Sequence, residues 1–383
     1  MRWRLDRQVD WTPWRGNVMA WKKILIAGGS GLVGSKAALH FGAQDGCDVL
    51  VASRRPPPVA GVRHLRLDLT DRVACAKALT GHGDITHIVY AAVYEQAGLV
   101  AGWSDAKQID VNDAMFRNLL DPLAGSVALR HVTLFQGTKA YGVHIRPFAN
   151  PAREGRSEYR EQPNFYWRQE DHLRETQVGK PWSWTILRPV HVFGDTIGVS
   201  LNAILGVGLY AAIMKHRGEP LHYPGGPPRL SEAVDADLLA RCVAWAGEAE
   251  TARNQVFNVA NGDVFTWENV WPSLARVFGM ELGEHRPLSL GQEMSRESAA
   301  WDEVRARHDL LSPSLEAFAG KSLQFADYTL RYGMGPQPPQ LVSTVKLRQA
   351  GFHEVMDTEA MFAKWFGRLQ ADRLLPPALA DAG

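Results

Sequence analysis

The sequence predicts an α/β protein: a doubly wound parallel sheet followed by a smaller, mainly helical region. An apolar run enters a glycine-rich turn at residues 23–34. Apolar runs typical of buried strands then alternate with helical stretches as far as about Phe193. After Gly194 the pattern changes to apolar helices, which are rich in aromatic residues from Trp267 on. With 383 residues, 45% of them hydrophobic, the chain is long enough to bury both regions.

Three glycines, Gly28, Gly31 and Gly34, form a G-x-x-G-x-x-G turn directly after the first apolar run. Gly28 allows a sharp turn, Gly31 leaves room for a pyrophosphate, and Gly34 lets the next helix pack closely against the strand. That helix offers phosphates its free backbone N–H groups and the positive end of its dipole. We interpret the turn as the phosphate-binding turn of a Rossmann fold; an ordinary glycine-rich turn is the alternative.

The order of the predicted elements supports this interpretation. Strands are predicted at about residues 24–27, 48–52, 65–68, 86–92, 131–135, 183–187 and 255–259, and helices at 35–41, 111–120, 200–215 and 235–246. We therefore predict an N-terminal extension (1–20), a cofactor-binding Rossmann domain (21–195, with a returning segment at about 231–263) and a substrate-binding region (196–230 and 264–383).

The end of the second predicted strand favours NADP(H) over NAD(H). A site specific for NAD carries a carboxylate there for the ribose 2′-hydroxyl, whereas this chain has Ser53, Arg54 and Arg55. Arginine forms charge-assisted bonds to phosphate, so this loop suits a 2′-phosphate, although a solvated basic loop is the alternative. Asp68 is placed to bind the adenine amino group. NADPH or NADP⁺ is the expected cofactor, with NADH as a less efficient substitute.

The composition excludes several classes of function. A formal net charge of +1 and a pI near 7.8 provide no basic field for nucleic acid. Cys47, Cys75 and Cys242 are too scattered for a disulfide framework or a zinc site, so we expect no metal and a reducing, cytoplasmic location. No apolar run suits a membrane span, and residues 1–21 lack signal-peptide features. A homodimer is compatible with the sequence, which does not fix the oligomeric state.

The usual catalytic motif of short-chain dehydrogenases is absent. Hydride transfer to a carbonyl or an enone builds negative charge on oxygen, so the site needs a hydrogen-bond donor there, commonly the tyrosine of a Y-x-x-x-K motif. Here Tyr141 is followed four residues later by Ile145, and Tyr166 by Glu170. Either the pair has been lost or the lysine comes from elsewhere.

Two segments favour a lysine from elsewhere: Gln136-Gly-Thr-Lys-Ala-Tyr-Gly, after a predicted strand, and Pro163-Asn-Phe-Tyr-Trp-Arg-Gln-Glu-Asp, which opens a helix. They resemble the T-G-x-K-H-Y and N-F-Y-Y-x-x-E-D motifs of the progesterone 5β-reductase and iridoid synthase family of extended short-chain dehydrogenases/reductases. The resemblance runs from about Trp21 to the end of the chain and includes residues 188–194, 210–216, 235–238 and 257–265.

The resemblance implies that Lys139 is the displaced catalytic lysine and Tyr166 the catalytic tyrosine. It also implies NADPH-dependent reduction of the C=C bond of an α,β-unsaturated carbonyl compound, with hydride added to the β-carbon and the enolate oxygen held by Tyr166 and Lys139. A small enone or enal is the expected substrate, with ketosteroids second. A nearby ammonium suits this role because it stabilises an ionised phenol, whose pKa in water is about 10.

Cofactor contacts are expected from the turn, the strand ends and the catalytic pair. These residues are Gly28, Ser30, Gly31, Leu32, Val33, Gly34, Ser53, Arg54, Arg55, Asp68, Leu69, Ala91, Lys139, Tyr166, Pro189 and Val190. By the resemblance, Phe148 and Asn202 lie near the substrate, although Asn202 also suits a helix start. Ala140 and Trp167 depart from the family, which has histidine and tyrosine there, so the substrate is the least determined feature.

Three other functions remain open at the level of sequence. Carbonyl (1,2-) reduction would use the same tyrosine and hydride. A nucleotide-sugar epimerase shares the extended fold but uses NAD and an intact Y-x-x-x-K motif. A non-catalytic NADP-sensing protein would keep the phosphate site without needing Lys139 or Tyr166. The aromatic residues after Trp267 suit either a lid over an apolar ligand or an ordinary core.

Overall fold

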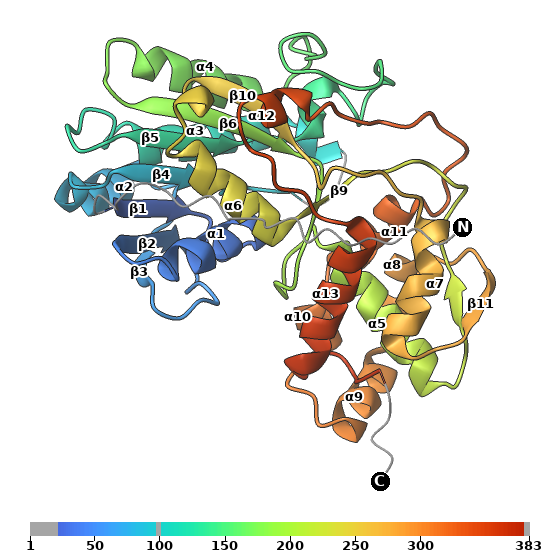
Figure 1. Cartoon of the computed structure of the whole chain (residues 1–383). Coiled ribbons are helices and arrows are strands. Elements are labelled where there is room, and N and C mark those ends of the chain that lie inside the picture. Colours follow the sequence, from blue (N-terminus) through green and yellow to red (C-terminus); the bar gives the residue numbers. More distant parts are fainter. Residues whose placement is uncertain (1–21, 97–100, 379–383) are drawn as a thin grey trace, which may run out of the picture.

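The computed structural model describes residues 22–96 and 101–378, which are built around a seven-stranded parallel sheet (Figure 1). The strands lie in the order β10-β6-β5-β4-β1-β2-β3, and every neighbouring pair is parallel. Their bounds are β1 Lys22–Ala27, β2 Cys47–Ser53, β3 Arg63–Arg66, β4 His87–Tyr90, β5 His131–Phe135, β6 Ser183–Pro189 and β10 Gln255–Val259. The predicted doubly wound Rossmann sheet is confirmed.

Helices cover both faces of this sheet, which explains why its strands are continuous apolar runs. Ile24 and Ile26 of β1 pack with α1 and α6, whereas Leu25 and Ala27 pack on the opposite face with α2 and α3. The helices of this part are α1 Leu32–Gly42, α2 Arg72–Leu79, α3 Ala106–Leu120, α4 Phe165–Gln177, α6 Ala236–Ala246 and α12 Val345–Gln349.

A second, mainly helical part adjoins the sheet, at the lower right of Figure 1. Its core is aromatic, with Trp271, Trp301 and Trp365 almost completely buried. The helices are α5 Ala203–His216, α7 Trp267–Phe278, α8 Leu290–Glu293, α9 Ser298–Arg307, α10 Leu315–Phe318, α11 Ser322–Leu330 and α13 Thr358–Ala371. Two small parallel pairs join β7 His191–Phe193 to β9 Ala233–Asp235, and β8 Leu221–Tyr223 to β11 Leu282–His285. Short 3₁₀ turns lie at Thr80–His82, Ala101–Ser104, Thr138–Tyr141, Glu250–Ala252 and Met294–Arg296.

Several boundaries differ from those expected. The first helix begins at Leu32 rather than at residue 35, and α5 begins at Ala203 rather than at residue 200. The strand expected at residues 86–92 ends at Tyr90. The backbone of Ala91 and Ala92 there runs directly against Gly28, so a β-carbon on Gly28 would lie 2.7 Å from the Ala92 nitrogen. The close approach of the glycine turn therefore ends this strand early.

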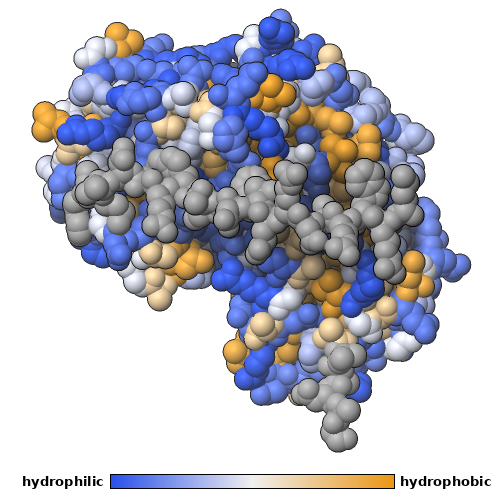
Figure 2. Space-filling view, in the orientation of Figure 1, coloured by the Kyte–Doolittle hydropathy of each residue, from blue (hydrophilic) through white to orange (hydrophobic). Residues whose placement is uncertain are grey.

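On the face shown in Figure 2, hydrophilic residues predominate and apolar residues form small, separate groups. Large exposed apolar side chains such as Val73, Val127 and Leu311 are spread over different elements. Scattered residues of this kind are normal on a protein surface. Within the described ranges, no helix combines the length and the apolar character needed to cross a bilayer.

The glycine turn depends on two positions that tolerate no side chain. Gly28 has φ of +81°, a left-handed conformation that favours glycine. Gly34, in the first turn of α1, faces the turn so closely that a β-carbon would overlap the Gly28 carbonyl group. Helix α1 therefore lies directly against the end of β1, as the glycine spacing predicts.

We expect Gly34→Ala to lower the free energy of unfolding by about 1–3 kcal/mol, because the added methyl group must push α1 away from the turn. Urea titration followed by circular dichroism measures this change. Gly367→Ala is the matched control: it also lies inside a helix, but nothing lies within 4 Å of its added methyl group. The control should keep or raise the stability, and an equally stable Gly34→Ala protein would contradict the close packing of α1.

Candidate active site

A cavity of about 540 Å³ opens at the carboxyl ends of the central strands. Its walls come from the segments that follow β1, β2, β4, β5 and β6, together with residues 198–201 and α11. The sheet order reverses between β1 and β4, since the chain runs outward to β2 and β3 on one side and to β5, β6 and β10 on the other. Ligands of open α/β sheets bind at such a switch point.

Most of the predicted cofactor contacts lie in this one cavity. Its walls include Gly28, Ser30, Gly31, Leu32, Val33, Ser53, Arg54, Arg55, Asp68, Leu69, Ala91, Lys139, Tyr166, Pro189 and Val190. Gly34 lies beneath the turn instead, where it allows α1 to pack.

The cavity carries the features that a dinucleotide requires at its phosphate end. Helix α1 begins at this end of the cavity. Its N-cap residue is Gly31, and no side-chain hydrogen bond caps the helix there. Arg54 and Arg55 are exposed at the rim, and Ser53 Oγ lies 3.2 Å from His64 Nε2. This set of donors, with no carboxylate at the end of β2, fits a pyrophosphate followed by a 2′-phosphate. His64 on β3, whose register partner on β2 is Val51, was not foreseen as a neighbour of Ser53, and it lies outside the cavity lining.

Asp68 borders the opposite side of this end of the cavity. Its Oδ1 accepts hydrogen bonds from the backbone N–H and the hydroxyl of Thr70, at 3.0 and 2.8 Å. These bonds, followed by the nearby Arg54, lower the pKa of Asp68 although burial opposes them. The carboxylate is therefore ionised at neutral pH, as an acceptor for an adenine amino group must be.

Lys139 and Tyr166 reach the same cavity from separate elements. Lys139 lies in the 3₁₀ turn Thr138–Tyr141 after β5, and Tyr166 lies in the first turn of α4. The side chain of Gln162 donates to the Lys139 carbonyl at 2.7 Å, and Asn164 caps α4 by accepting from the Tyr166 N–H at 3.0 Å. Gly137 leaves space for the phenol, since a β-carbon there would lie 3.3 Å from the Tyr166 hydroxyl.

Burial shifts the pKa values of both groups. It lowers the pKa of Lys139 to about 8, although Glu95 acts in the opposite direction. Burial raises the pKa of Tyr166 above its ordinary value; Glu95 adds to the increase and Arg188 opposes it. At neutral pH the tyrosine is therefore a neutral hydrogen-bond donor, and the lysine in the same cavity is largely charged.

Two histidines near the lysine are neutral under the same conditions. Burial, with a further effect of Lys139, lowers the pKa of His144 to about 4. Burial, followed by Arg229 and Lys139, lowers the pKa of His191 to about 4 as well. Neither histidine therefore adds a positive charge to the site at neutral pH.

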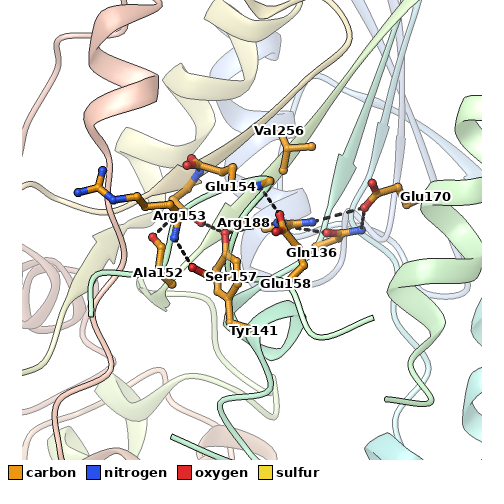
Figure 3. Close-up of polar contacts among 12 residues, drawn as sticks. Gln136, Tyr141, Ala152, Arg153, Glu154, Ser157, Glu158, Glu170, Arg188 and Val256 are labelled. Atoms are coloured by element: carbon orange, nitrogen blue, oxygen red, sulfur yellow. Dashed lines mark hydrogen bonds and ion pairs between the residues drawn. The ribbon is translucent and has the colours of Figure 1, made fainter. Parts of the chain in front are cut away.

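A buried guanidinium fixes the elements that carry Lys139 and Tyr166 (Figure 3). Arg188, at the end of β6, is 1% exposed; its Nε donates to Gln136 Oε1 at 2.7 Å and its Nη1 to Glu158 Oε1 at 2.6 Å. The Gln136 amide donates in turn to Glu170 Oε2 at 2.9 Å and to the Tyr166 carbonyl at 3.2 Å. The ends of β5 and β6 are thus tied to the first two turns of α4.

Tyr141, the other tyrosine considered from the sequence, belongs to this network. Its hydroxyl donates to Asn258 Oδ1 at 2.6 Å and accepts from Arg188 at 3.4 Å. Burial raises its pKa to about 12, with Arg188 opposing this effect. Tyr141 therefore has a structural environment and does not line the cavity.

Phe148 and Asn202, expected near the substrate, are absent from the cavity lining. Phe148 packs beside Tyr141, with ring centroids 6.0 Å apart. Asn202 is fully buried at the start of α5, where its amide donates to the carbonyls of Gly194 and Thr196 at 2.8 and 3.2 Å. The side chain of Asn202 forms no capping hydrogen bond to α5; it ties the start of the helix to the segment after β7 instead.

Other side chains form the end of the cavity beyond the catalytic pair. Trp103, Phe165, Phe325 and Tyr328 give it an aromatic wall, and Glu95 and His191 add polar groups. The sequence analysis did not identify these residues individually. Of the aromatic residues after Trp267, only Phe325 and Tyr328 reach the described cavity, while most of the others form the core.

The sheet, the glycine turn and the lysine–tyrosine pair define a Rossmann-fold oxidoreductase of the extended short-chain dehydrogenase/reductase type. Similar solved structures include UDP-N-acetylglucosamine 4-epimerase from Methanobrevibacter ruminantium, with a TM-score of 0.65 and 15% identity over 92% of this chain and 99% of that one. UDP-glucose 4-epimerase from Thermus thermophilus has a TM-score of 0.63 and 17% identity over 91% and 99%. At these identities the likeness concerns the fold alone.

Sequence comparison identifies the family. The model of the PRISE-like Rossmann-fold domain matches residues 78–376, so the chain belongs to the PRISE family, as its motifs predict. An (S)-8-oxocitronellyl enol synthase from Camptotheca acuminata is 32% identical over 92% of this chain and 93% of the relative. A 3-oxo-Δ(4,5)-steroid 5β-reductase from Arabidopsis thaliana is 30% identical over 92% of each chain.

We expect Arg188→Met to lower the free energy of unfolding by about 3–5 kcal/mol, because Glu158 would keep a largely buried charge without its partner and Gln136 Oε1 would lose its buried donor. Arg174→Met is the matched control, since Arg174 also pairs with Glu170 but is 45% exposed and should cost less than about 1 kcal/mol. Guanidinium chloride titration measures both changes. Equal effects of the two substitutions would contradict the role assigned to Arg188.

Proposed function

We propose that this protein is an NADPH-dependent ene-reductase that reduces the activated C=C bond of α,β-unsaturated carbonyl compounds. The observation that carries the proposal is the meeting of Lys139 and Tyr166, from separate segments, in the cavity that also holds the glycine turn. Family membership supports it, because relatives named enol synthase and steroid 5β-reductase cover nearly the whole chain.

The mechanism depends on how Tyr166 and Lys139 stabilise the negative charge that develops on the substrate oxygen. NADPH, when bound, would supply the hydride. The neutral phenol of Tyr166 donates a hydrogen bond to the carbonyl oxygen of the substrate, and this bond strengthens as the oxygen becomes an enolate. The ammonium of Lys139 lies in the same buried cavity, where an electrostatic interaction is stronger than in water. Addition of a proton to the α-carbon then completes the saturated carbonyl product.

The cavity wall favours an apolar substrate. Trp103, Phe165, Phe325 and Tyr328 surround the space beyond the catalytic pair, and aromatic surfaces of this kind suit a hydrocarbon skeleton. We therefore favour small enones and enals, with ketosteroids as the second class. The proposed substrate-binding region, residues 196–230 and 264–383, contributes Phe325, Tyr328 and residues 198–201 to this wall.

Reduction of the C=C bond can be tested by product analysis with NADPH and a panel of small enones, citral and progesterone. We expect saturated carbonyl products, and we expect Tyr166→Phe to lower turnover by about 10²-fold or more, because it removes the hydrogen bond to the enolate. NADPH binding, followed by fluorescence, should change little. Tyr332→Phe is the matched control, since Tyr332 lies outside the cavity lining.

The same experiment separates the other functions. Allylic alcohols would show carbonyl reduction, and unchanged turnover of Tyr166→Phe on every accepted substrate would contradict the catalytic assignment. NADPH binding without turnover of any compound would instead favour an NADP-sensing protein.

Cofactor preference gives a second test. We expect replacement of Arg54 and Arg55 by glutamine to weaken NADPH binding roughly tenfold or more and to leave NADH binding nearly unchanged, because only NADPH carries the 2′-phosphate. Titration of protein fluorescence with each cofactor measures both constants. Arg66→Gln removes an exposed charge from β3 outside the cavity lining and should not change the preference. If the double variant bound NADPH as tightly as the wild type, Arg54 and Arg55 would be solvated residues that do not bind the 2′-phosphate.

A further inference from the structure

The catalytic lysine lacks the direct partner that a buried ammonium ordinarily has. Within residues 22–96 and 101–378, no hydrogen bond or ion pair reaches Lys139 Nζ, which instead lies 3.6 Å from the centre of the Trp103 ring. The attraction of a cation to an aromatic face is weaker than the cost of burying its charge. Another group must therefore help to keep this lysine charged.

Glu95 lines the same cavity as Lys139, and it is the carboxylate whose charge acts on this lysine. Among the groups that act on the lysine, it is the anion; His144 and His191 are neutral at neutral pH, and Tyr166 is a neutral phenol. Lys321 of the helical part is the other cation that acts on Glu95. The charge balance at Lys139 thus depends on Glu95.

Backbone anchors on both sides hold Glu95 in position. The Tyr94 N–H donates to Asn112 Oδ1 at 2.8 Å, and the Asn112 amide donates back to the Tyr94 carbonyl at 2.8 Å. The Gln96 N–H donates to Gln108 Oε1 at 2.8 Å. Asn112 and Gln108 are buried residues of α3, so the segment that carries Glu95 is fixed to a helix packed against the sheet.

We propose that Glu95 is a positioning residue that keeps the catalytic pair in its proton-donating form. Burial raises the pKa of Glu95, and Lys139, followed by Lys321, opposes this increase. As a carboxylate, Glu95 favours the ammonium form of Lys139 and also disfavours ionisation of the Tyr166 phenol. Both effects maintain the groups that interact with the enolate oxygen. The proposal rests on the proposed function and adds a residue that the two catalytic motifs do not contain.

The proposal has a defined consequence for the pH dependence of the reaction. The pKa of Lys139 is about 8 with Glu95 present, so activity that needs the ammonium falls as the pH rises through this value. Glu95→Gln removes the attraction that raises the pKa of Lys139. Its pKa then falls further, and the alkaline limb of the profile moves to lower pH.

The first measurement is the pH profile of kcat/KM for the full-length protein and its variants. We expect the alkaline limb of Glu95→Gln to move to lower pH by about one unit or more, whereas Glu95→Asp, which keeps the charge, stays closer to the wild type. Glu232→Gln is the matched control. Glu232 is also a half-buried carboxyl, which accepts from the Val342 N–H at 2.7 Å, but it lies outside the cavity lining. If the alkaline limb of the pH profile were the same for the wild type and for Glu95→Gln, the proposal would be overturned.

A second measurement does not need turnover. Competitive labelling with acetic anhydride over a range of pH, followed by mass spectrometry of the peptide that contains Lys139, gives the pKa of this lysine directly. We expect a lower pKa in Glu95→Gln than in the wild type and in Glu232→Gln. This result would support the role of Glu95 even if the protein reduced no enone, and equal values would reject it even if the ene-reductase activity were present.

Discussion

The buried guanidinium of Arg188 is the interaction on which the geometry of the site depends. A charge in this position is costly to bury, and the cost is offset only if its partners meet it with good geometry. Those partners come from β5, α4 and the segment before α4, through Gln136, Glu170 and Glu158. Because these contacts are directional, they allow one arrangement of the strand ends against the helix. Lys139 lies in the turn after β5 and Tyr166 in the first turn of α4, so this arrangement also fixes where these two side chains enter the cavity.

This constraint explains how the site forms without the Y-x-x-x-K spacing. In that motif one helical turn sets the distance between tyrosine and lysine, whereas here the distance is set by tertiary contacts. Gln162 ties the Lys139 carbonyl to the segment before α4, and Asn164 caps the helix at Tyr166. Long-range hydrogen bonds thus take the place of the Y-x-x-x-K spacing, in which tyrosine and lysine lie one helical turn apart. Lys139 and Tyr166 lie on separate elements instead.

The sequence predicted most of the fold because the signals for it are local. Buried strands such as β1 appear as apolar runs, and the positions of Gly28 and Gly34 predict a turn in which side chains do not fit. Lys139 and Tyr166 were identified by resemblance to family motifs, and the structure brings both into one cavity. Arg188 lay in a matching segment, but its buried network has no local pattern. Tyr141, which accepts from Arg188, donates to Asn258, 117 positions away along the chain.

The residues at the proposed substrate end of the cavity were also less predictable, because long-range contacts without a local sequence pattern place them. Phe148 and Asn202 were expected there, yet Phe148 packs beside Tyr141, and the buried amide of Asn202 donates to the carbonyls of Gly194 and Thr196, outside the lining. Glu95 and Trp103 take their positions from α3 and from the segment before it, and no spacing in the sequence connects them with Lys139.

The cavity wall joins two parts of the chain that have separate hydrophobic cores. The turn, Lys139 and Tyr166 belong to the sheet part, whereas Phe325 and Tyr328 project from α11 of the helical part. Substitutions on the cavity side of α11 can therefore alter the shape offered to a substrate while the sheet core and the Arg188 network stay intact. Such a division lets selection, natural or in the laboratory, explore new substrates without rebuilding the chemistry.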